Sequence, residues 1–303
     1  MRIRGLLLLS LAIVATWLVL PGHNRGSSVA ATDQALTVMT YNVGDDRLPN
    51  PTSTQIAHVI RRAGVPDLLL LQDNIDPAVI AQLAQQLGLP HHLSGRDSAP
   101  KVNASLLSRF PLNGAQSLLF ENTNAMTGMI CADVEARTTT FLACSLYMPS
   151  LSDVARQVVD VRRDKYRDII NLLWEEIFHE TPRSRSVARI FDWLGKRAAG
   201  TVIIGGDFNT FPQSRSIHFM ARRFEDALWF TADNLVGTYI KLNFPLRPRI
   251  DYLFHSGDIA VEGAAVIRDT AGDHYPVRAR MILPVAAPHT TRASAALPNA
   301  LNR

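Results

Sequence analysis

Oxygen-rich side chains stand at the ends of several apolar segments of this sequence, and one histidine lies beside an aspartate. Carboxylates in such positions are costly to desolvate unless they hold a cation or one another. Hard divalent cations such as Mg²⁺ prefer carboxylate, amide and water oxygens, and a histidine next to a carboxylate can move a proton or stabilise a phosphoryl oxygen. The pattern therefore predicts a divalent-cation site with one imidazole. Its candidate residues are Asn42, Asp73, Asp207, Asn209, Asp251, Asp273 and His274.

The elements that must position these residues follow from the hydrophobic pattern. Short apolar runs predict strands, and longer runs with helical spacing predict helices. Strands alternate with helices but also occur in hairpin pairs, which fits two packed sheets flanked by helices better than one parallel sheet. A polar Pro/Ser/Arg stretch at 181–186 is predicted to be a loop. The predicted strands are 35–43, 67–72, 103–108, 128–136, 139–148, 201–204, 249–254 and 264–267, and the predicted helices are 54–63, 77–87 and 153–178.

Seven short motifs in a fixed order carry a family resemblance. They are TYNV with Asn42, LLLLQD with Asp73, NASLLSRFPL at 103–112, LYMPS with Tyr147, GGDFN at 205–209, RIDYLF at 249–254 and GDHYPV at 272–277. In this order they resemble the endonuclease/exonuclease/phosphatase superfamily, which includes DNase I, the exonuclease III type of abasic-site endonuclease, the neutral sphingomyelinases and the inositol polyphosphate 5-phosphatases. The resemblance covers about residues 36–283.

The resemblance implies a DNase I-like, four-layered α/β sandwich in which two packed mixed sheets are flanked by helices. It also implies a phosphoric ester hydrolase that depends on Mg²⁺, or on Mn²⁺ or Ca²⁺. By position in the motifs, Asp73 is expected to be the main metal ligand, helped by Asn42 and Asp273.

The same positions imply catalytic roles. Asp207 is expected to orient or deprotonate the attacking water, and Asn209 to donate a hydrogen bond to the phosphate. His274, paired with Asp251, is expected to contact the scissile phosphate as a base or as a charged stabiliser. Tyr147 resembles the active-site tyrosine of the abasic-endonuclease branch.

Two departures from the family pattern bear on activity. Asp73 stands where the family almost always has Glu, so its carboxylate falls more than ~1 Å short unless the backbone or a bridging water compensates. This implies weaker cation affinity, a preference for larger cations such as Mn²⁺ or Ca²⁺, or loss of activity. The strand before the longest helix reads CSLY at 144–147, where many members carry a His-Leu pair, and Tyr147 is the residue that could substitute for the missing histidine.

The charge of the chain does not identify the substrate. Although the formal net charge is +4, residues 31–283 hold 26 basic and 27 acidic side chains, so overall basicity is no evidence for nucleic acid. The presence of Tyr147 without the second histidine favours a nuclease acting on DNA or RNA over a phospholipid substrate. A sphingomyelinase-like or other small-molecule phosphodiesterase is the alternative, as is a catalytically weakened binding module of the same fold. No stable protein partner is predicted, and a monomer is expected.

The two ends of the chain differ from the middle in composition. Residues 1–30 combine basic Arg2 and Arg4 with an apolar run of 16 residues and small residues at Ser28–Ala30, which is typical of a signal peptide, with a retained membrane anchor as the alternative. We therefore expect an exported protein, secreted or periplasmic, with a domain at 33–284 and a disordered tail at 285–303.

The two cysteines stand in the predicted hairpin 128–136 and 139–148. A turn near Arg137-Thr138 places Cys131 opposite Cys144. An exported chain could oxidise them to a disulfide, but two buried thiols fit the sequence equally well, because directly paired strand cysteines often form strained bridges.

Overall fold

The computed structural model describes residues 34–44, 50–73, 76–120, 126–137, 139–150, 165–197, 200–240 and 247–284. The predicted signal or anchor, the predicted tail and the first half of the helix predicted at 153–178 lie outside these residues. Within the described parts of the chain, no helix is both long enough and apolar enough to span a bilayer.

The first of two six-stranded sheets is built around β1 (Ala35–Asn42), the predicted N-terminal strand. This strand pairs in parallel with β2 and antiparallel with β12, so the sheet is mixed. In β2 every residue is buried, as expected for a leucine run covered on both faces. The order of the sheet is β11 (Ala260–Val266), β12 (Val277–Ile282), β1, β2 (Leu68–Gln72), β4 (Ala104–Ser108) and β3 (His91–Ser94).

The second sheet contains the predicted cysteine hairpin. Cys131 and Cys144 are Cα partners across the hairpin, and their sulfurs form a disulfide with an S–S distance of 2.06 Å, which settles the alternative that the sequence left open. The order of the sheet is β5 (Leu112–Leu119), β6 (Gly128–Ala136), β7 (Thr139–Tyr147), β8 (Val202–Asp207), β10 (Asp251–His255) and β9 (Glu225–Asp226).

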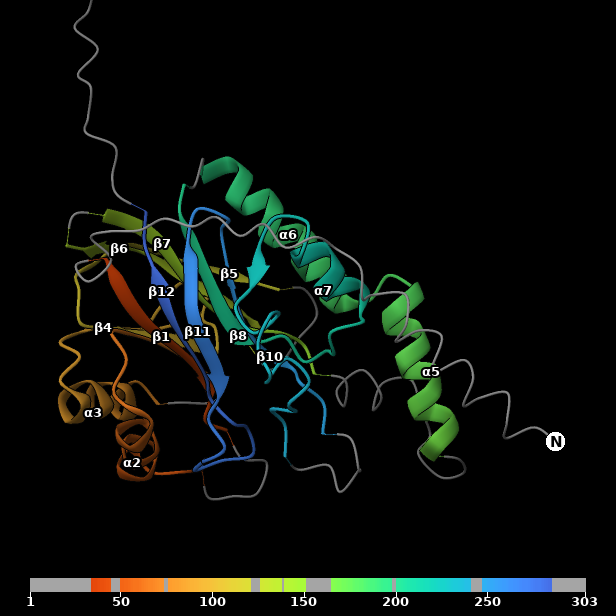
Figure 1. The fold of residues 1–303 in the computed structure, drawn as a ribbon, viewed down its shortest axis with the longest axis horizontal. Coiled ribbons are helices and arrows are strands. Elements are labelled where there is room, and N and C mark those ends of the chain that lie inside the picture. Colours follow the sequence, from red (N-terminus) through yellow and green to blue (C-terminus); the bar gives the residue numbers. More distant parts are fainter. Residues whose placement is uncertain are drawn as a thin grey trace, which may run out of the picture. The chain divides into compact units, whose positions relative to one another are not determined.

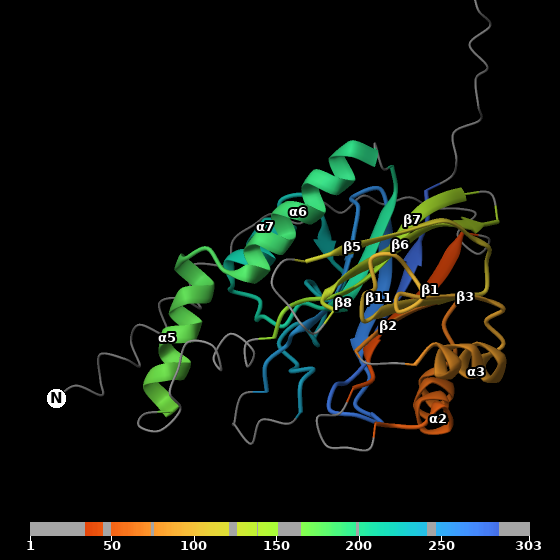
Figure 2. The same cartoon turned by 180° about the vertical axis from the view of Figure 1, so that it is seen from behind.

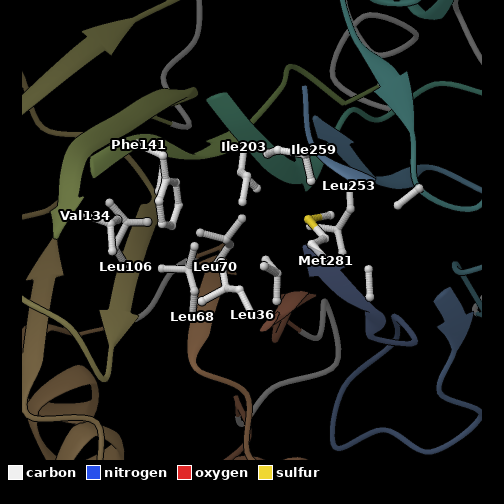
Figure 3. Close-up of a cluster of buried hydrophobic side chains, with 14 of the residues drawn as sticks. Leu36, Leu68, Leu70, Leu106, Val134, Phe141, Ile203, Leu253, Ile259 and Met281 are labelled. Carbon is white, nitrogen blue, oxygen red and sulfur yellow. The ribbon is translucent and has the colours of Figure 1, made fainter. Parts of the chain in front are cut away.

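The two sheets pack face to face through a core of aliphatic side chains (Figure 3). Alternate residues of each strand point into this space, among them Leu70 from β2 and Ile203 from β8. Gly205 follows on the same face of β8, where a Cβ would lie 2.5 Å from Leu70 and 2.7 Å from Leu253. Glycine therefore lets the sheets approach closely just before β8 ends at Asp207.

Helices cover the outer face of each sheet (Figures 1 and 2). The pair α2 (Ser53–Ala63) and α3 (Pro77–Leu87) buries its apolar residues against the first sheet. On the second sheet, α6 (Pro182–Arg197) and the short α7 (Arg215–Met220) pack in the same way, and α5 (Lys165–Phe178) precedes them in the chain. Helix, sheet, sheet and helix form the four-layered α/β sandwich that the resemblance implied.

The loop predicted at 181–186 is wrong, because this stretch begins α6. Its polar residues are the start signals of a helix. The Thr181 N–H donates to Ser184 Oγ at 2.9 Å, and the Ser184 N–H donates back to Thr181 Oγ1 at 3.4 Å, with Pro182 at the first helical position. A composition typical of loops is therefore also typical of a capped helix N-terminus.

Candidate active site

The inward-facing residues of the strands change from leucine to polar side chains toward one end of the sandwich. Thr40 and Gln72 of the first sheet lie there, opposite Ser145 of the second. The Gln72 amide donates to Ser145 Oγ at 3.0 Å and accepts from Thr40 Oγ1 at 3.2 Å, and Ser145 Oγ donates to the Leu71 carbonyl at 2.9 Å. All three side chains are buried, so this hydrogen-bonded link joins the two sheets where water is excluded.

Beyond this link, three of the predicted residues form a row across the second sheet. Asp207 of β8 is the Cα partner of Tyr147 in β7 and of Asp251 in β10. Residues paired in this way project from the same face of a sheet. Asn42, the last residue of β1, reaches Asp207 from the other sheet, and its Nδ2 donates to Asp207 Oδ2 at 2.9 Å.

The Asp207 carboxylate is buried and orders the turn that follows it. Its Oδ1 accepts from the Asn209 N–H at 2.7 Å, and its Oδ2 accepts from Asn209 Nδ2 at 3.1 Å. Asn209 itself adopts a positive φ of 50°, and its Nδ2 also donates to the Met148 carbonyl at 2.9 Å. Burial and the negative charge of Asp251 raise the pKa of Asp207 to about 7, although His274 and the hydrogen bonds oppose the shift.

His274 lies between three carboxylates. Its Nδ1 is 2.8 Å from Asp251 Oδ2, and its Nε2 is 3.7 Å from Asp273 Oδ1 and 3.9 Å from Asp207 Oδ2. Burial alone lowers the pKa of the imidazole, but the charge and hydrogen bond of Asp251, together with the charges of Asp207 and Asp273, outweigh it and raise the pKa of His274 to about 10. The ring is therefore a cation at neutral pH, and its Nδ1–H donates to Asp251.

Backbone pairing holds His274 in this position. Tyr239 forms an antiparallel bridge with His274, and their ring centroids are 5.0 Å apart. The neighbouring Thr238 accepts hydrogen bonds at its Oγ1 from the backbone N–H groups of Ile250 at 3.0 Å and Asp251 at 3.1 Å. One short segment thus fixes both the imidazole and its carboxylate partner. The sequence did not single out Tyr239 or Thr238.

Asp251 is available to His274 because the neighbouring arginine has another partner. Arg249 Nη1 lies 2.7 Å from Asp226 Oδ2, and its guanidinium carbon is 4.4 Å from the centre of the Tyr252 ring. Asp251 has one buried oxygen, Oδ1, with no hydrogen-bond partner among the described residues. The carboxylate therefore retains a free acceptor inside the site.

Asp73, the expected main metal ligand, lies beside this group on the first sheet. It adopts a positive φ of 68° directly after β2, and its N–H donates to the Asn103 carbonyl at 3.0 Å. A Cβ at Gly44 would lie 2.1 Å from Asp73 Oδ2, so only glycine admits the carboxylate there. Gly44 also donates from its N–H to Asn42 Oδ1 at 2.9 Å and accepts from the Asp273 N–H at 3.3 Å. The three predicted metal ligands thus gather around Gly44.

The donor set suits a hard divalent cation. Ligand atoms of Asp207, Asp251 and His274 all lie within 4.8 Å of one another, and because the His274 ring is protonated, the two carboxylates are the available donors of this group. The free Oδ1 of Asp251 adds an acceptor that the described residues do not satisfy. Carboxylate and amide oxygens match Mg²⁺, Mn²⁺ or Ca²⁺ rather than a thiolate-preferring metal. This group consists of predicted catalytic residues and adjoins the predicted ligands through the Asn42–Asp207 hydrogen bond.

A buried ion pair behind the site was missed at the sequence level. Glu176 of α5 and Arg183 of α6 are each 1% exposed and bind each other through Oε1 and Nη2. Glu176 Oε2 accepts from Thr210 Oγ1 at 2.8 Å, and Arg183 Nη1 donates to the Pro149 carbonyl at 2.9 Å. Thr210 follows Asn209, and Pro149 follows the residue whose carbonyl binds the Asn209 amide. The pair therefore clamps the two segments that hold Asn209. The long separation of these four residues in sequence hid the connection.

Comparisons with known proteins agree with this fold. A family model described as "Endonuclease/Exonuclease/phosphatase family" matches residues 39–274. No curated protein matches the chain in sequence. A solved endonuclease/exonuclease/phosphatase from Beutenbergia cavernae DSM 12333 is 18% identical with a TM-score of 0.60, covering 83% of this chain and 72% of its own.

Two further solved structures have the same fold. Humanized D. rerio TDP2 is 13% identical with a TM-score of 0.58 over 82% of this chain and 99% of its own. The mannosyl-6-phosphatase of Bacteroides thetaiotaomicron VPI-5482 is 17% identical with a TM-score of 0.58 over 82% of this chain and 100% of its own. At these identities the similarity establishes the fold, and the choice of substrate rests on the chain's own residues.

Proposed function

Because the chain belongs to the endonuclease/exonuclease/phosphatase family, whose members hydrolyse phosphoesters, we propose that it is an exported, divalent-metal-dependent phosphodiesterase that acts on nucleic acid. The observation that carries this proposal is the convergence of four side chains from distant segments. Asn42 binds Asp207, His274 binds Asp251, and His274 Nε2 stands 3.9 Å from Asp207. A buried imidazolium beside two carboxylates has the chemistry to handle both a proton and a phosphoryl charge.

In this proposal Asp207 is the general base. Its pKa near 7 suits a group that must accept a proton from water at neutral pH. Asn42 and Asn209 hold the carboxylate in one orientation, since both donate to its Oδ2. Asn209 acts mainly by positioning Asp207, because its amide N–H groups are already directed at Asp207 and the Met148 carbonyl.

His274 is the charged stabiliser rather than the base. The carboxylates around it keep the ring protonated at neutral pH, so its Nε2–H can donate to a phosphoryl oxygen that gains charge as the ester is attacked. Asp251 fixes the ring through Nδ1. Tyr147 is the register partner of Asp207, and in this proposal it contacts the phosphate in place of the second histidine of other members.

Asp73, Asn42 and Asp273 would hold the cation. When bound, a divalent cation supplies Lewis-acid stabilisation of the phosphoryl oxygens. The shorter Asp73 side chain weakens the affinity for Mg²⁺ and favours the larger cations Mn²⁺ and Ca²⁺, because larger cations tolerate longer metal–ligand paths.

Export is supported by the disulfide. Disulfides persist in oxidising compartments and are rare in reducing ones, and Cys131–Cys144 joins two buried strands of the second sheet. The basic and apolar N-terminal segment supports the same conclusion, either as a cleaved signal or as an anchor.

A substrate panel tests the function. The purified protein is incubated with plasmid DNA, RNA, sphingomyelin or bis-p-nitrophenyl phosphate, each with Mg²⁺, Mn²⁺, Ca²⁺ or EDTA. We expect metal-dependent cleavage of DNA or RNA that EDTA abolishes and that Asp207→Asn removes. Hydrolysis of sphingomyelin alone would replace nucleic acid by lipid, and silence on every substrate and ion would favour the binding module.

A lipid phosphodiesterase is the second candidate, and one observation favours it. Trp174 and Phe178 of α5 have ring centroids 4.2 Å apart and are 55% and 53% exposed, and Phe230 is 85% exposed. Exposed aromatic side chains are a common means of contacting a lipid surface. The sphingomyelin arm of the panel decides between the two substrates.

A further inference from the structure

Basic side chains outnumber acidic ones between the start of α6 and the turn after α7. Between Pro182 and Glu225 there are eight Lys or Arg residues and three Asp or Glu residues, one of which is the buried Asp207. The rest of residues 31–283 holds 18 basic and 24 acidic side chains. Arg183, Arg185 and Arg197 of this stretch pair with Glu176, Glu180 and Asp133, so its excess of positive charge comes from the remaining basic residues.

Three arginines of this stretch have no acidic partner within the part of the chain that the structure describes. Among the described residues, Arg215, Arg222 and Arg223 form no ion pair with a carboxylate, whereas Arg197 of α6 binds Asp133 at 2.6 Å. Arg222 and Arg223 are exposed, and Arg215 is half-buried. We define these three residues as the arginine surface. Arginines held only for stability would be expected to pair with acids, as Arg249 does with Asp226.

Aromatic rings order the arginine surface. The guanidinium carbons of Arg215 and Arg222 lie 5.1 Å and 4.8 Å from the centre of the same Phe219 ring, and that of Arg223 lies 4.5 Å from the centre of the Phe191 ring. A guanidinium held over a ring loses mobility but keeps its charge and its N–H donors for an anion. The donors are thus pre-oriented for an anion without being consumed by the fold.

The spacing suits a strand of phosphates. Because they share one ring, the guanidinium groups of Arg215 and Arg222 lie within about 10 Å of each other. A nucleic acid strand carries one charge per ~3.4 Å of helix axis, so both groups can meet phosphates of the same strand. The surface spans α7 and the turn after it, and α7 packs beside α6 in both views (Figures 1 and 2).

The arginine surface is connected to the active site through one short segment. Arg215 begins α7 only six residues after Asn209, and the Ser214 N–H that precedes it donates to the Phe211 carbonyl at 3.0 Å. The side chain of Ser214 caps α7 by accepting from the Ile217 N–H at 3.3 Å. Arg222 and Arg223 precede Glu225 of β9, which pairs with His255 at the end of β10 opposite Asp251, so the surface leads from the active-site end of the second sheet toward its other end.

We propose that Arg215, Arg222 and Arg223 form an ancillary phosphate-binding surface that holds the backbone of a nucleic acid away from the scissile bond. The identity of the polyanion rests on the proposed function, and the surface itself rests on the charge distribution and the stacked guanidinium groups. Such contacts read no sequence, so the surface increases affinity without adding base specificity.

Equilibrium binding in EDTA tests this proposal separately from catalysis. The full chain is titrated against fluorescein-labelled single-stranded and duplex DNA of about 20 nucleotides, longer than the ~4–16 that one single-strand-binding domain covers. Affinity is measured by anisotropy at roughly 50–200 mM NaCl. For Arg222→Gln/Arg223→Gln we expect about tenfold weaker binding at low salt and a salt slope smaller by about two, since each lost phosphate contact reduces it by roughly one.

A matched double variant controls for a general change of charge. Arg62→Gln/Arg280→Gln removes the same charge from exposed positions that pair with Asp269 and Glu262 on the other side of the fold. Its affinity and salt slope are expected to equal those of the unsubstituted protein. Equal losses in both variants would overturn the proposal, as would wild-type binding by Arg222→Gln/Arg223→Gln. Far-UV circular dichroism and thermal melting establish that each variant is folded, and single substitutions replace the pair if it is not.

The remaining outcomes separate the surface from the enzyme. If the protein cleaves DNA but the arginine substitutions do not change DNA binding, the proposed function is supported and the proposed phosphate-binding surface is overturned. If DNA binding depends on the arginines but no substrate is cleaved, the phosphate-binding surface is supported and the proposed function is overturned. Loss of binding to phosphatidylglycerol vesicles with unchanged DNA binding would overturn the proposal by assigning the arginines to an anionic membrane.

Discussion

Asp207 ends the fully buried strand β8 and Asp73 directly follows the fully buried strand β2, yet their surroundings differ. Asp207 is 1% exposed and accepts three hydrogen bonds from Asn42 and Asn209. Asp73 is half-buried and stands in a left-handed turn against Gly44. The difference separates two tasks. In the proposed function, the surroundings of Asp207 set its proton affinity, and the half-buried Asp73 exchanges a cation with solvent.

The largest effect is expected at Asp207. Asp207→Asn keeps the shape and most hydrogen bonds of the side chain but removes the proton acceptor, so kcat should fall roughly 10³-fold, within the range of general-base catalysis. Asp73→Asn should remain measurably active at saturating cation. Steady-state rates on the preferred substrate measure both. If kcat falls equally in Asp207→Asn and Asp73→Asn at saturating cation, the two aspartates do not have separate roles in proton transfer and cation binding.

Proton affinity at His274 is expected to depend on Asp251. In metal-free protein the imidazole should stay protonated up to a pH of about 10, because the carboxylate charges outweigh burial. Asp251→Asn removes the largest of these charges and leaves burial in place, which lowers the pKa toward neutral pH. NMR of the imidazole ¹⁵N resonances against pH measures it. A ring that titrates near 6.5 in the unsubstituted protein would contradict the charge assignment.

Changes at Asp73 are expected to act on the cation. Asp73→Ala should raise the cation concentration for half-maximal activity by about 10–100-fold, and Asp73→Glu should lower it, since the longer side chain restores the family's reach. Activity against Mg²⁺ and Mn²⁺ concentration measures both variants. If Asp73→Glu abolishes activity at every concentration, the turn at Gly44 is built for the shorter side chain.

The smallest change in rate is expected at the buried ion pair. Glu176→Gln leaves the Arg183 charge uncompensated, so the free energy of unfolding should fall by about 3 kcal/mol, and kcat should fall several-fold as Asn209 loses its clamp. Glu176→Leu/Arg183→Met should recover the stability but not the rate, because an apolar pair fills the space without holding Thr210. Urea unfolding and steady-state kinetics distinguish the two. If the double variant recovers both the stability and the rate, the ion pair contributes only packing.

The sequence predicted the candidate site residues better than the buried residues that hold them in place. Each predicted site residue lies in a short motif at the end of a strand, and strands bring such ends together whatever the intervening chain does. Six of these residues are linked by contacts in the structure, namely Asn42, Asp207, Asn209, Asp251, Asp273 and His274. Asp73 lies beside them at Gly44, and Tyr147 beside Asp207 by register.

What the sequence could not show depends on contacts between distant polar residues. Glu176 and Arg183 look like solvated charges in their helices, and only the fold reveals that both are buried against Thr210 and Pro149. The same limit applies to α6, whose polar first turn concealed a helix, and to the arginine surface, which the charge balance of the whole chain concealed.

The Gln72 link has a consequence for how the domain tolerates change. The aliphatic side chains between the sheets can exchange for others of similar volume, because apolar packing has no directional preference. The amide of Gln72 does have a directional preference, since it must form hydrogen bonds with Thr40 and Ser145 at the same time. If one sheet slipped along the other, these buried polar groups would lose their hydrogen-bond partners. The link therefore fixes the position of one sheet along the other. It keeps Asn42 opposite Asp207 even when the apolar residues around it are substituted.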